Sequence, residues 1–502
     1  MNRQIHQVTV LVVVLFLVLG VSVTSVQGFA HPALWEFSSP QGNLVTDVRN
    51  SRTVYSEFGR DRGDITVANG TIVTSEESDD AYGYQRVYSD GPLYAPVTGY
   101  FSTVFASMTG LERAENTVLN GQDPSLFSSR IKSLITGDTQ KGGAIELTIN
   151  PQVQQAAWDA LSGRRGSVVA LDPSSGAILA MVSSPSYDPT QIASHDGGTA
   201  QSAWNSLNED EGNPMANRAI GGDLYPPGST FKPAQGAIFL AEGVLTPSTP
   251  LSCYGGYPRL GGKPKCHPHG SPISLIPALA TSCNAYFCWG MHFLLDDRKR
   301  YPSVEVALEH WKERIVRLGY GYRLGVDLPG EKRGYIPNSS VYDKAYKGRW
   351  NSSTIISISI GQGEVLATPL QIANLAAIIA NRGSYIRPHL VRHISGQRLD
   401  TMYTQRQQSG ISPEHWEYIV QGMAQAVTGG TCRAANFAPG QIEVCGKTGT
   451  AENPHGKDHS AFIGFAPRTR PRIAVSVISS LLMENCLRCS AGTSTTCTDL
   501  PA

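Results

Sequence analysis

One short polar motif combines a serine with a lysine in a pattern that suits acyl transfer. Ser229 and Lys232 form S-x-x-K after the turn-forming residues 225–228 and before the apolar helical pattern of residues 234–241. Ser229 is therefore expected at the start of a helix, whose positive end favours an oxyanion. A spacing of three places Lys232 on the same face, where burial and nearby cations can keep the amine neutral and able to accept the serine proton. Pro233 is expected to distort the first turn because it lacks an amide hydrogen.

Two further motifs raise the significance of this pair, since a chain of this length holds on the order of two S-x-x-K matches by chance. Ser282-Cys283-Asn284 falls inside an apolar helical pattern from Leu275 to Leu294, where polar side chains need a reason. A strand pattern over 442–448 leads into Lys447-Thr448-Gly449-Thr450. This segment offers a cation, hydroxyls and a glycine that lets a substrate backbone approach. The three motifs together predict a site with catalytic Ser229, Lys232, Ser282, Asn284 and Lys447, and substrate-binding Thr448, Gly449 and Thr450.

The cysteines cluster in the second half of the chain. None of the nine precedes Cys253, so disulfides cannot hold the first half together, and their odd number leaves at least one thiol without an intrachain partner. Cys432 and Cys445 either form a disulfide, worth about 3 kcal/mol for a loop of this size, or remain two buried thiols.

A second cysteine group has metal-ligand spacing. Cys3His is an established ligand set for structural zinc. If Ser282 and Asn284 face the cleft, the intervening Cys283 must point elsewhere, and it can tie residues 255–270 to the segment that carries Ser282. The alternatives are a Cys253–Cys266 disulfide or unlinked residues, and His267 is a substitute ligand. The predicted zinc ligands, spaced Cys-x12-Cys-x2-His-x13-Cys, are Cys253, Cys266, His269 and Cys283.

The elements that must position these residues read as an α+β domain. Residues 166–172 and 177–182 form a hairpin pattern, and strand patterns return at 442–448, 461–466 and 472–479. Helical patterns lie between them, at 275–294 and 369–380, and another precedes them at 151–161, with Asn150 as its N-cap. Strands at both ends with helices between predict an antiparallel sheet whose outer strands are far apart in sequence.

The first 150 residues predict an anchor and a pedestal. Residues 8–26 carry no charge and are about long enough to span a bilayer. Because Arg3 precedes this run and no Lys or Arg follows it until Arg49, residues 1–7 are expected in the cytoplasm, 8–28 in the membrane and the rest outside. The alternative is a signal peptide cleaved near residues 28–30. Residues 29–150 read as short alternating β segments without a catalytic cluster, so their simplest role is that of a spacer.

Composition excludes one class of partner. The 502 residues hold 41 Lys plus Arg and 41 Asp plus Glu, and charged residues make up 16% of the chain. A zero balance without a basic run argues against binding of nucleic acid.

The three motifs resemble those of the penicillin-binding proteins, and of class B in particular. The resemblance extends to Arg62-Gly63-Asp64-Ile65, residues 147–150, Gly361-Gln362-Gly363 and Thr368-Pro369. Residues 253–464 are similar to elongation-type penicillin-binding protein 2, and the first half is closer to a branch with a short pedestal. About 120 residues between the anchor and Asn150 are too few for the glycosyltransferase domain of class A.

The resemblance implies a pedestal, or dimerisation-like domain, over 29–150. It also implies a transpeptidase domain over 151–482 with the penicillin-binding/β-lactamase-like fold, an antiparallel sheet flanked by helices. The tail 483–502 lacks the periodicity of the helix with which the family ends.

The implied activity is that of a D,D-transpeptidase that cross-links peptidoglycan stem peptides and is acylated by β-lactams. Ser229 would attack, Lys232 would accept its proton, and Ser282 with Asn284 would relay protons and bind substrate amides. Lys447 would support the relay, Thr448 and Thr450 would hold the terminal carboxylate, and the amides of Ser229 and Thr450 would form the oxyanion hole. This chemistry needs no metal or organic cofactor.

The resemblance also implies a location and partners. The protein would sit in the bacterial cytoplasmic (inner) membrane as a single-pass protein with a periplasmic catalytic domain. Its partners would be a SEDS-type membrane glycosyltransferase and the cell-wall elongation complex that sets cell shape.

Rival functions remain open. A D,D-carboxypeptidase or a β-lactamase-type hydrolase shares the acyl-serine chemistry and differs in that water deacylates the enzyme; the anchor and pedestal favour a fixed cross-linking enzyme instead. A β-lactam sensor or a scaffold is the non-enzymatic rival, but only seven residues precede the apolar run. A Ser/His/Asp hydrolase is disfavoured because the chain has no G-x-S-x-G.

Overall fold

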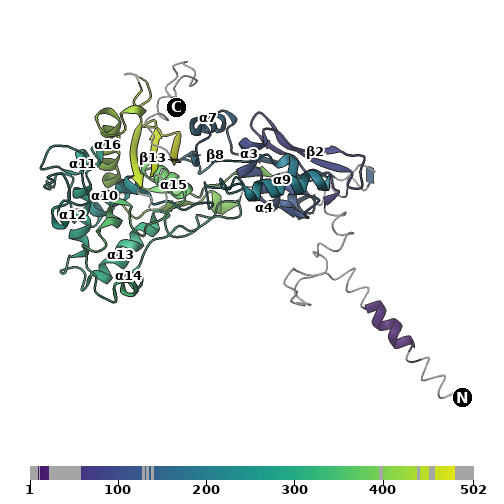
Figure 1. Ribbon diagram of the computed structural model, residues 1–502, viewed down its shortest axis with the longest axis horizontal. Coiled ribbons are helices and arrows are strands. Elements are labelled where there is room, and N and C mark those ends of the chain that lie inside the picture. The colour runs from purple at the N-terminus through teal and green to yellow at the C-terminus, as the bar shows by residue number, and fades with distance from the viewer. Residues whose placement is uncertain are drawn as a thin grey trace.

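A computed structural model describes residues 10, 12–21, 58–126, 131, 135–136, 141–394, 400–437, 441–451 and 458–480. Figure 1 shows an elongated molecule in which a pedestal at one end and a helical lobe at the other flank a central sheet.

The central sheet has five strands in the order β12-β13-β14-β7-β8, and every neighbouring pair is antiparallel. Its edge strands, β12 and β8, lie far apart in the sequence, which confirms the predicted arrangement. Strand β14, near the end of the chain, pairs with β7 of the β7–β8 hairpin. The strands are β7 (Gly166–Leu171), β8 (Ile178–Ser184), β12 (Cys445–Ala451), β13 (His459–Ala466) and β14 (Ile473–Ser479).

Helices cover both faces of this sheet, so β7 is buried along its whole length and reads as a nearly continuous apolar run. Val168 and Ala170 belong to an apolar cluster with α7 (Pro151–Leu161), whereas the alternate residues Val169 and Leu171 belong to the main core. All residues of α15 (Pro369–Ala380) are buried in that core. Both helices have the predicted bounds, because an N-cap side chain followed by proline fixes each start.

The helical lobe lies beyond the edge strand β12. Within it, α16 packs along β12 and against α11. The lobe contains α10 (Lys232–Ala241), α11 (Leu275–Ala280), α12 (Asn284–Leu295), α13 (Val304–Arg317), α14 (Ser339–Tyr346) and α16 (Pro413–Gly429), with 3-10 turns η2 (Gly228–Phe231), η3 (Pro258–Leu260), η4 (Ile356–Ile360) and η6 (Arg433–Ala435).

The single helix predicted over residues 275–294 is wrong, because the chain breaks it in two at residues 281–283. Ser282 has φ +58°, a left-handed conformation that interrupts α-helical hydrogen bonding. The Cys283 side chain then caps the second helix by accepting a bond from the Tyr286 amide at 3.4 Å. The unbroken apolar pattern hid this break.

The pedestal is built on a second five-stranded sheet, in the order β10-β6-β1-β2-β3. Two buried arginines, Arg62 and Arg86, form ion pairs with the buried Glu112 at 2.7 and 2.6 Å. The sheet contains β1 (Ile65–Val67), β2 (Gly70–Glu77), β3 (Tyr84–Tyr88), β6 (Ile145–Leu147) and β10 (Val391–Ile394).

Smaller elements complete the pedestal and the connections. Helix α9 packs its buried Ala203 against pedestal residues Ala95 and Tyr100. These elements are α3 (Gly91–Thr98), α4 (Gly110–Ala114), α5 (Asn116–Leu119), α8 (Pro189–Ile192), α9 (Gly197–Glu209), β4 (Phe101–Ser102), β5 (Ser107–Met108), β9 (Ser384–Ile386), β11 (Arg406–Gln408), η1 (Pro124–Leu126) and η5 (Thr401–Tyr403).

The pedestal and the central sheet share one core. A continuous cluster of buried apolar residues runs from Ile65 in β1 to Ile478 in β14. Strand β10 comes from the far half of the chain, so residues beyond 150 also build the pedestal. The boundary placed at residue 150 stays a prediction.

Of the predicted anchor, residues 10 and 12–21 are described, and they are helical. Among the described residues, no helix combines the length and the apolar character needed to cross a membrane. The tail 483–502 and the remaining anchor residues lie outside the described part of the chain.

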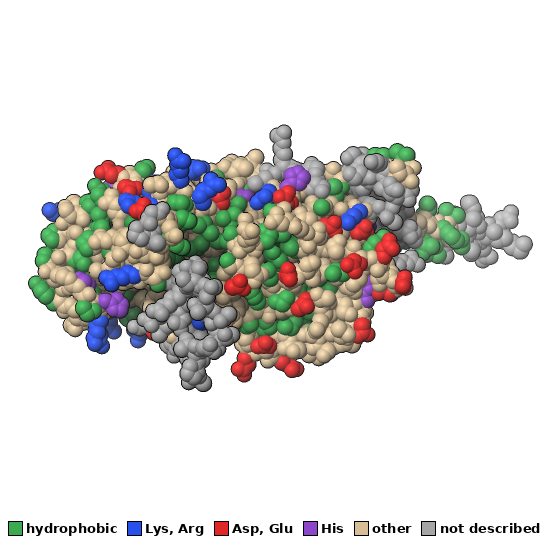
Figure 2. Space-filling model, turned by 90° about the horizontal axis from the view of Figure 1, so that it is seen from above, with side chains coloured by type: hydrophobic (Ala, Val, Ile, Leu, Met, Phe, Trp, Pro, Cys, Tyr) green, Lys and Arg blue, Asp and Glu red, His purple; other side chains and the backbone are tan. Residues whose placement is uncertain are grey.

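The zero net charge conceals an uneven distribution. On the face drawn in Figure 2, acidic side chains gather toward the pedestal end and basic side chains toward the end with the helical lobe.

Candidate active site

Ser229 lies in the short turn that leads into α10. The turn η2 is a 3-10 helix that becomes α-helical at Lys232, which confirms the distortion expected from Pro233. The Gly228 amide bonds to the Gly361 carbonyl at 2.9 Å, and a Cβ on Gly361 would lie 2.3 Å from the Gly228 carbonyl oxygen. The glycine at 361 is therefore required for the close contact that seats the half-buried Ser229.

Lys232 is fully buried and points toward the second motif. Its Nζ donates to the Ser282 carbonyl at 2.7 Å, to Ser282 Oγ at 3.1 Å and to Asn284 Oδ1 at 2.5 Å. Burial, and next the charge of Lys447, lowers the pKa of Lys232 to about 7. A substantial fraction of this amine is therefore neutral near pH 7 and able to take a proton.

Lys447 reaches the same serine from β12. Its Nζ donates to Ser282 Oγ at 2.8 Å and to the Thr448 carbonyl at 2.8 Å. Burial lowers the pKa of Lys447 to about 8. The Ser282 hydroxyl thus sits between two buried amines, a position from which it can pass protons between them.

The third motif lies on an edge strand. β12 ends its sheet, so one side of the strand is free of a neighbouring strand within the described residues. A Cβ on Gly449 would lie 3.0 Å from the Thr230 amide nitrogen, so this glycine lets the strand approach the Ser229 turn. Thr448 is half-buried and Thr450 exposed. Their hydroxyls and the strand's backbone can therefore meet an extended peptide.

The structure brings the eight predicted site residues together from three segments of the chain: η2 with the start of α10, the turn that leads into α12, and β12. It does not show the direct contact between Ser229 and Lys232 that the sequence predicted. Among the hydrogen bonds of the described residues, none joins Ser229 Oγ to Lys232 Nζ. Hydrogen bonds of catalytic groups are often long before substrate binds, so this geometry leaves Lys232 as the candidate base.

Two further residues contact the third motif without having been assigned a role from the sequence. Thr448 Oγ1 donates to Thr431 Oγ1 at 3.0 Å, and Gln362 Nε2 donates to the Thr450 carbonyl at 3.2 Å. No sequence motif includes Thr431; the glycine pair at 429–430 before it indicates only the end of a helix, and α16 ends there. Gln362 lies in the Gly361-Gln362-Gly363 segment that carried part of the resemblance.

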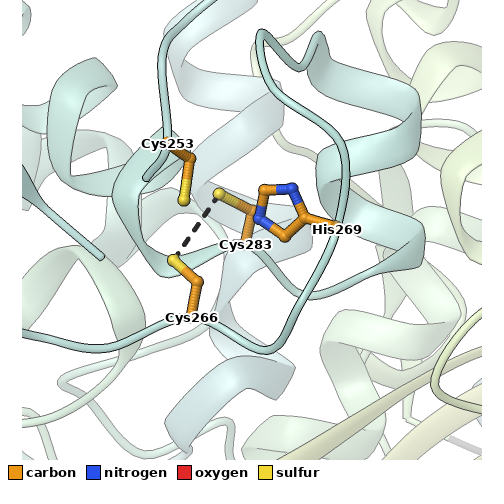
Figure 3. A group of neighbouring side chains, drawn as sticks. All are labelled: Cys253, Cys266, His269 and Cys283. Carbon is orange, nitrogen blue, oxygen red and sulfur yellow. Dashed lines mark hydrogen bonds between the residues drawn. The ribbon is translucent and has the colours of Figure 1, made fainter. Parts of the chain in front are cut away.

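The predicted zinc ligands also come together, directly behind the second motif. Figure 3 shows three thiols that point toward one another and the His269 ring beside them. The ligand atoms of the four residues all lie within 4.8 Å of one another. Cys266 Sγ lies 3.8 Å from Cys283 Sγ, a contact that lowers the pKa of Cys266 and raises that of Cys283. Ser282 and Asn284 face Lys232, as expected, while the thiol between them faces the cluster.

The loop that carries Cys266 and His269 is hydrogen-bonded to the start of α12. The Asn284 side chain donates to the Lys265 carbonyl at 2.6 Å, and the Ala285 amide donates to Cys266 Sγ at 3.3 Å. The cysteine cluster and the Lys232 contact therefore share one residue, Asn284.

The disulfide considered for Cys432 and Cys445 is wrong. Both residues are free thiols, and they belong to different clusters of buried residues. The separation of 13 residues allowed a loop to close, but it did not show which way each thiol points. Cys253, Cys266 and Cys283 are also free thiols, so the Cys253–Cys266 disulfide is not formed in the structure.

Known proteins are similar to this chain in both sequence and fold. Residues 166–481 match the penicillin binding protein transpeptidase domain, and residues 62–145 match the penicillin binding protein A dimerisation domain. The peptidoglycan D,D-transpeptidase PbpA of Mycolicibacterium smegmatis is 38% identical over 95% of this chain and 94% of its own length. MrdA of Acinetobacter baumannii, also a peptidoglycan D,D-transpeptidase, is 30% identical over 78% of this chain and 62% of its own length.

A solved structure agrees. The imipenem acyl-enzyme complex of penicillin-binding protein A from M. tuberculosis superposes with a TM-score of 0.70 at 34% identity, over 85% of this chain and 95% of that one. The sequence identity, the coverage and the two matched domains all indicate the same family. The chain belongs to the class B penicillin-binding protein transpeptidases.

Proposed function

We propose that the protein is a serine-type peptidoglycan D,D-transpeptidase, acylated by the D-Ala-D-Ala end of a stem peptide and by β-lactams. The observation that carries the proposal is the Ser282 hydroxyl held between two buried amines, with Ser229 at the adjacent helix start. These contacts give a nucleophile, a base of suitable pKa and a route for its proton.

The acylation half-reaction follows from these contacts. Neutral Lys232 takes the proton of Ser229 as Oγ bonds to the carbonyl carbon of the penultimate D-alanine. The backbone amides of Ser229 and Thr450 stabilise the oxyanion, each donor contributing on the order of 10² to 10³ in rate. The proton then passes from Lys232 through the Ser282 hydroxyl to the nitrogen of the departing D-alanine. The amine of a second stem peptide attacks the acyl-serine by the reverse path and releases the cross-linked product.

Substrate binding uses the edge strand. The free side of β12 pairs with the extended peptide, Asn284 binds a substrate amide, and Thr448 and Thr450 bind the terminal carboxylate. Lys447 keeps its charge and supports the anion.

The anchor and partners belong to the same proposal. Residues 8–28 anchor the enzyme in the cytoplasmic membrane with the catalytic domain outside; support comes from the uncharged run and from the exposed apolar side chains of the described helix, such as Phe16 and Leu17. A SEDS-type glycosyltransferase would supply the glycan strands within the cell-wall elongation complex, as the resemblance of the three motifs implies.

The experiment uses a D-Ala-D-Ala-terminated donor peptide with and without a D-amino acid acceptor, and mass spectrometry of the products. Transpeptidation predicts an exchanged product that requires Ser229 and is absent with Ser229→Ala. Release of the hydrolysed donor alone, at a rate that the acceptor does not change, would assign the protein to the carboxypeptidases instead. Binding of β-lactam without turnover of any donor would favour a sensor.

We further propose that Cys253, Cys266, His269 and Cys283 hold a structural zinc ion. Two sulfurs bound to zinc at about 2.3 Å in tetrahedral geometry lie about 3.8 Å apart. Cys266 and Cys283 have this separation, 3.8 Å. A disulfide would need a sulfur–sulfur distance of about 2.05 Å.

The histidine is oriented as a ligand. His269 Nδ1 lies 2.7 Å from the Gly270 carbonyl, while its buried Nε2 has no hydrogen-bond partner among the described residues. A ring that donates from Nδ1 to a carbonyl offers an unprotonated Nε2 to a metal. His267, the substitute ligand, is exposed and not part of the cluster. Zinc would fix the loop against α12; catalysis itself uses no metal.

Elemental analysis tests this site. Purified protein should contain about one zinc per chain, and Cys253→Ala should lose the metal and melt at a lower temperature. Cys288→Ala is the matched control, because Cys288 is also buried but contacts Ser359 and not the cluster. Metal-free protein with a Cys253–Cys266 disulfide would overturn the zinc site.

A further inference from the structure

A backbone hydrogen bond to Ala280 holds Thr431 beside the third motif. Helix α16 ends at Gly429, and the Thr431 amide donates to the Ala280 carbonyl at 3.1 Å, two residues before Ser282. A Cβ on Gly430 would lie 2.2 Å from that same carbonyl oxygen, so only glycine permits this approach. The backbone of Thr431 is thereby tied to the segment that carries the second motif.

The side chain of Thr431 reaches the strand that carries the third motif. Its Oγ1 accepts the hydrogen bond of Thr448 Oγ1 at 3.0 Å, and it also lies 3.8 Å from Cys432 Sγ, a contact in which either atom can donate. Thr431 is exposed and Thr448 half-buried, so this hydroxyl pair is open to solvent.

The pair suits a carboxylate. A carboxylate has two acceptor oxygens and forms short hydrogen bonds, of about 2.5–2.7 Å, with hydroxyl donors. In the structure the Thr448 hydroxyl donates its hydrogen bond to Thr431 Oγ1. A carboxylate that binds between the two hydroxyls can accept a hydrogen bond from each. Lys447, the neighbour of Thr448 in the chain, places its amine 2.8 Å from the Thr448 carbonyl and so adds positive charge to this part of the site.

We propose that Thr431 is a substrate-binding residue that donates, together with Thr448, to the terminal carboxylate of the donor peptide and to the carboxylate of β-lactams. The inference rests on the proposed acyl-serine function and extends its carboxylate site from the third motif to the loop after α16. Thr431 also connects the third motif to the segment just before the second, because it contacts both Thr448 and Ala280.

The test measures acylation by penicillin G and by its methyl ester, which lacks the anion. Thr431→Val keeps the branched shape and removes the hydroxyl; Thr431→Ala is a second variant, and Thr431→Ser restores the donor. Thr428→Val is the matched control, since within the described part of the chain the exposed Thr428 hydroxyl bonds only to carbonyls of its own helix, at 3.3 and 3.5 Å.

Loss of one hydrogen bond to a charged group predicts a loss of about 10-fold or more in the acylation efficiency of Thr431→Val and Thr431→Ala with penicillin G. The loss should fall on the apparent affinity rather than on the limiting rate, and Thr431→Ser and Thr428→Val should stay within about 3-fold of the parent protein. With the ester, Thr431→Val and the parent should react alike.

Two results overturn the inference: parent-like acylation of both hydroxyl-free variants by penicillin G, or an equal loss toward the ester, which would indicate a merely structural role. Failure of the parent protein to react with penicillin G would instead refute the proposed function itself.

Discussion

The pH dependence of acylation follows from the two buried lysines. Lys232 must be neutral to accept the Ser229 proton, and its pKa is lowered to about 7 by burial and by Lys447. Lys447 acts as a cation, and burial lowers its pKa to about 8. Activity should therefore rise with pH through about 7, fall through about 8, and peak between the two values.

The size of the change in acylation rate with pH follows from these two pKa values. At pH 6 about one tenth of the protein carries neutral Lys232, and at pH 9 about one tenth carries charged Lys447. The product of the two fractions is then about sixfold below its maximum at either pH. Because the amines share Ser282, the two limbs report macroscopic pKa values of the pair.

The assay is the second-order rate of acylation by a fluorescent penicillin from pH 5.5 to 9.5, with folding monitored in parallel. In Lys447→Met the alkaline limb should disappear. Its acid limb should move to higher pH, because the positive charge that lowers the Lys232 pKa is gone. Lys344→Met, an exposed lysine on α14, should keep the parent profile. A rate that does not change between pH 5.5 and 7.5, or an acid limb unmoved in Lys447→Met, would refute the assignment of Lys232 as base.

Two predictions concern the framework. Glu112→Gln should destabilise the pedestal by about 3–5 kcal/mol in denaturant unfolding, because it leaves Arg62 and Arg86 buried without their counter-ion. The control Glu146→Gln removes a half-exposed ion pair and should cost no more than about 1 kcal/mol. Equal losses of stability in the two variants would contradict the role given to the buried pair. Gly361→Ala should lower acylation at least 10-fold, because the added Cβ meets the Gly228 carbonyl next to the nucleophile. Gly348→Ala has the same φ, +71°, but open space around it, and should lose stability alone; parent-like acylation by Gly361→Ala would show that the close contact does not position Ser229.

Local signals were enough to predict much of this fold. The helices 151–161 and 369–380 start where an Asn or Thr N-cap precedes a proline, and the structure has the same bounds. The antiparallel sheet followed from strand patterns at both ends of the domain. The three motifs indicated which residues would meet, because each combines a turn or strand end with polar groups that a core would otherwise exclude.

The missed features depend on non-local contacts or backbone conformation. Apolar periodicity cannot show that Ser282 adopts φ +58°, so the helix break was hidden. Nothing local to residues 391–394 indicates that β10 pairs with β6 in the pedestal. Thr431 is an isolated hydroxyl in the sequence, and only the Ala280 contact of its backbone places it beside Thr448.

The central claim is that Ser229 is the nucleophile of an acyl-serine enzyme. The direct measurement is intact-mass and peptide-mapping mass spectrometry of the full chain after reaction with penicillin G, beside Ser229→Ala. The account predicts one penicilloyl adduct per chain, on the peptide that contains Ser229, and none in the folded variant. An adduct on another residue, an adduct that persists in Ser229→Ala, or folded parent protein that forms none would contradict it.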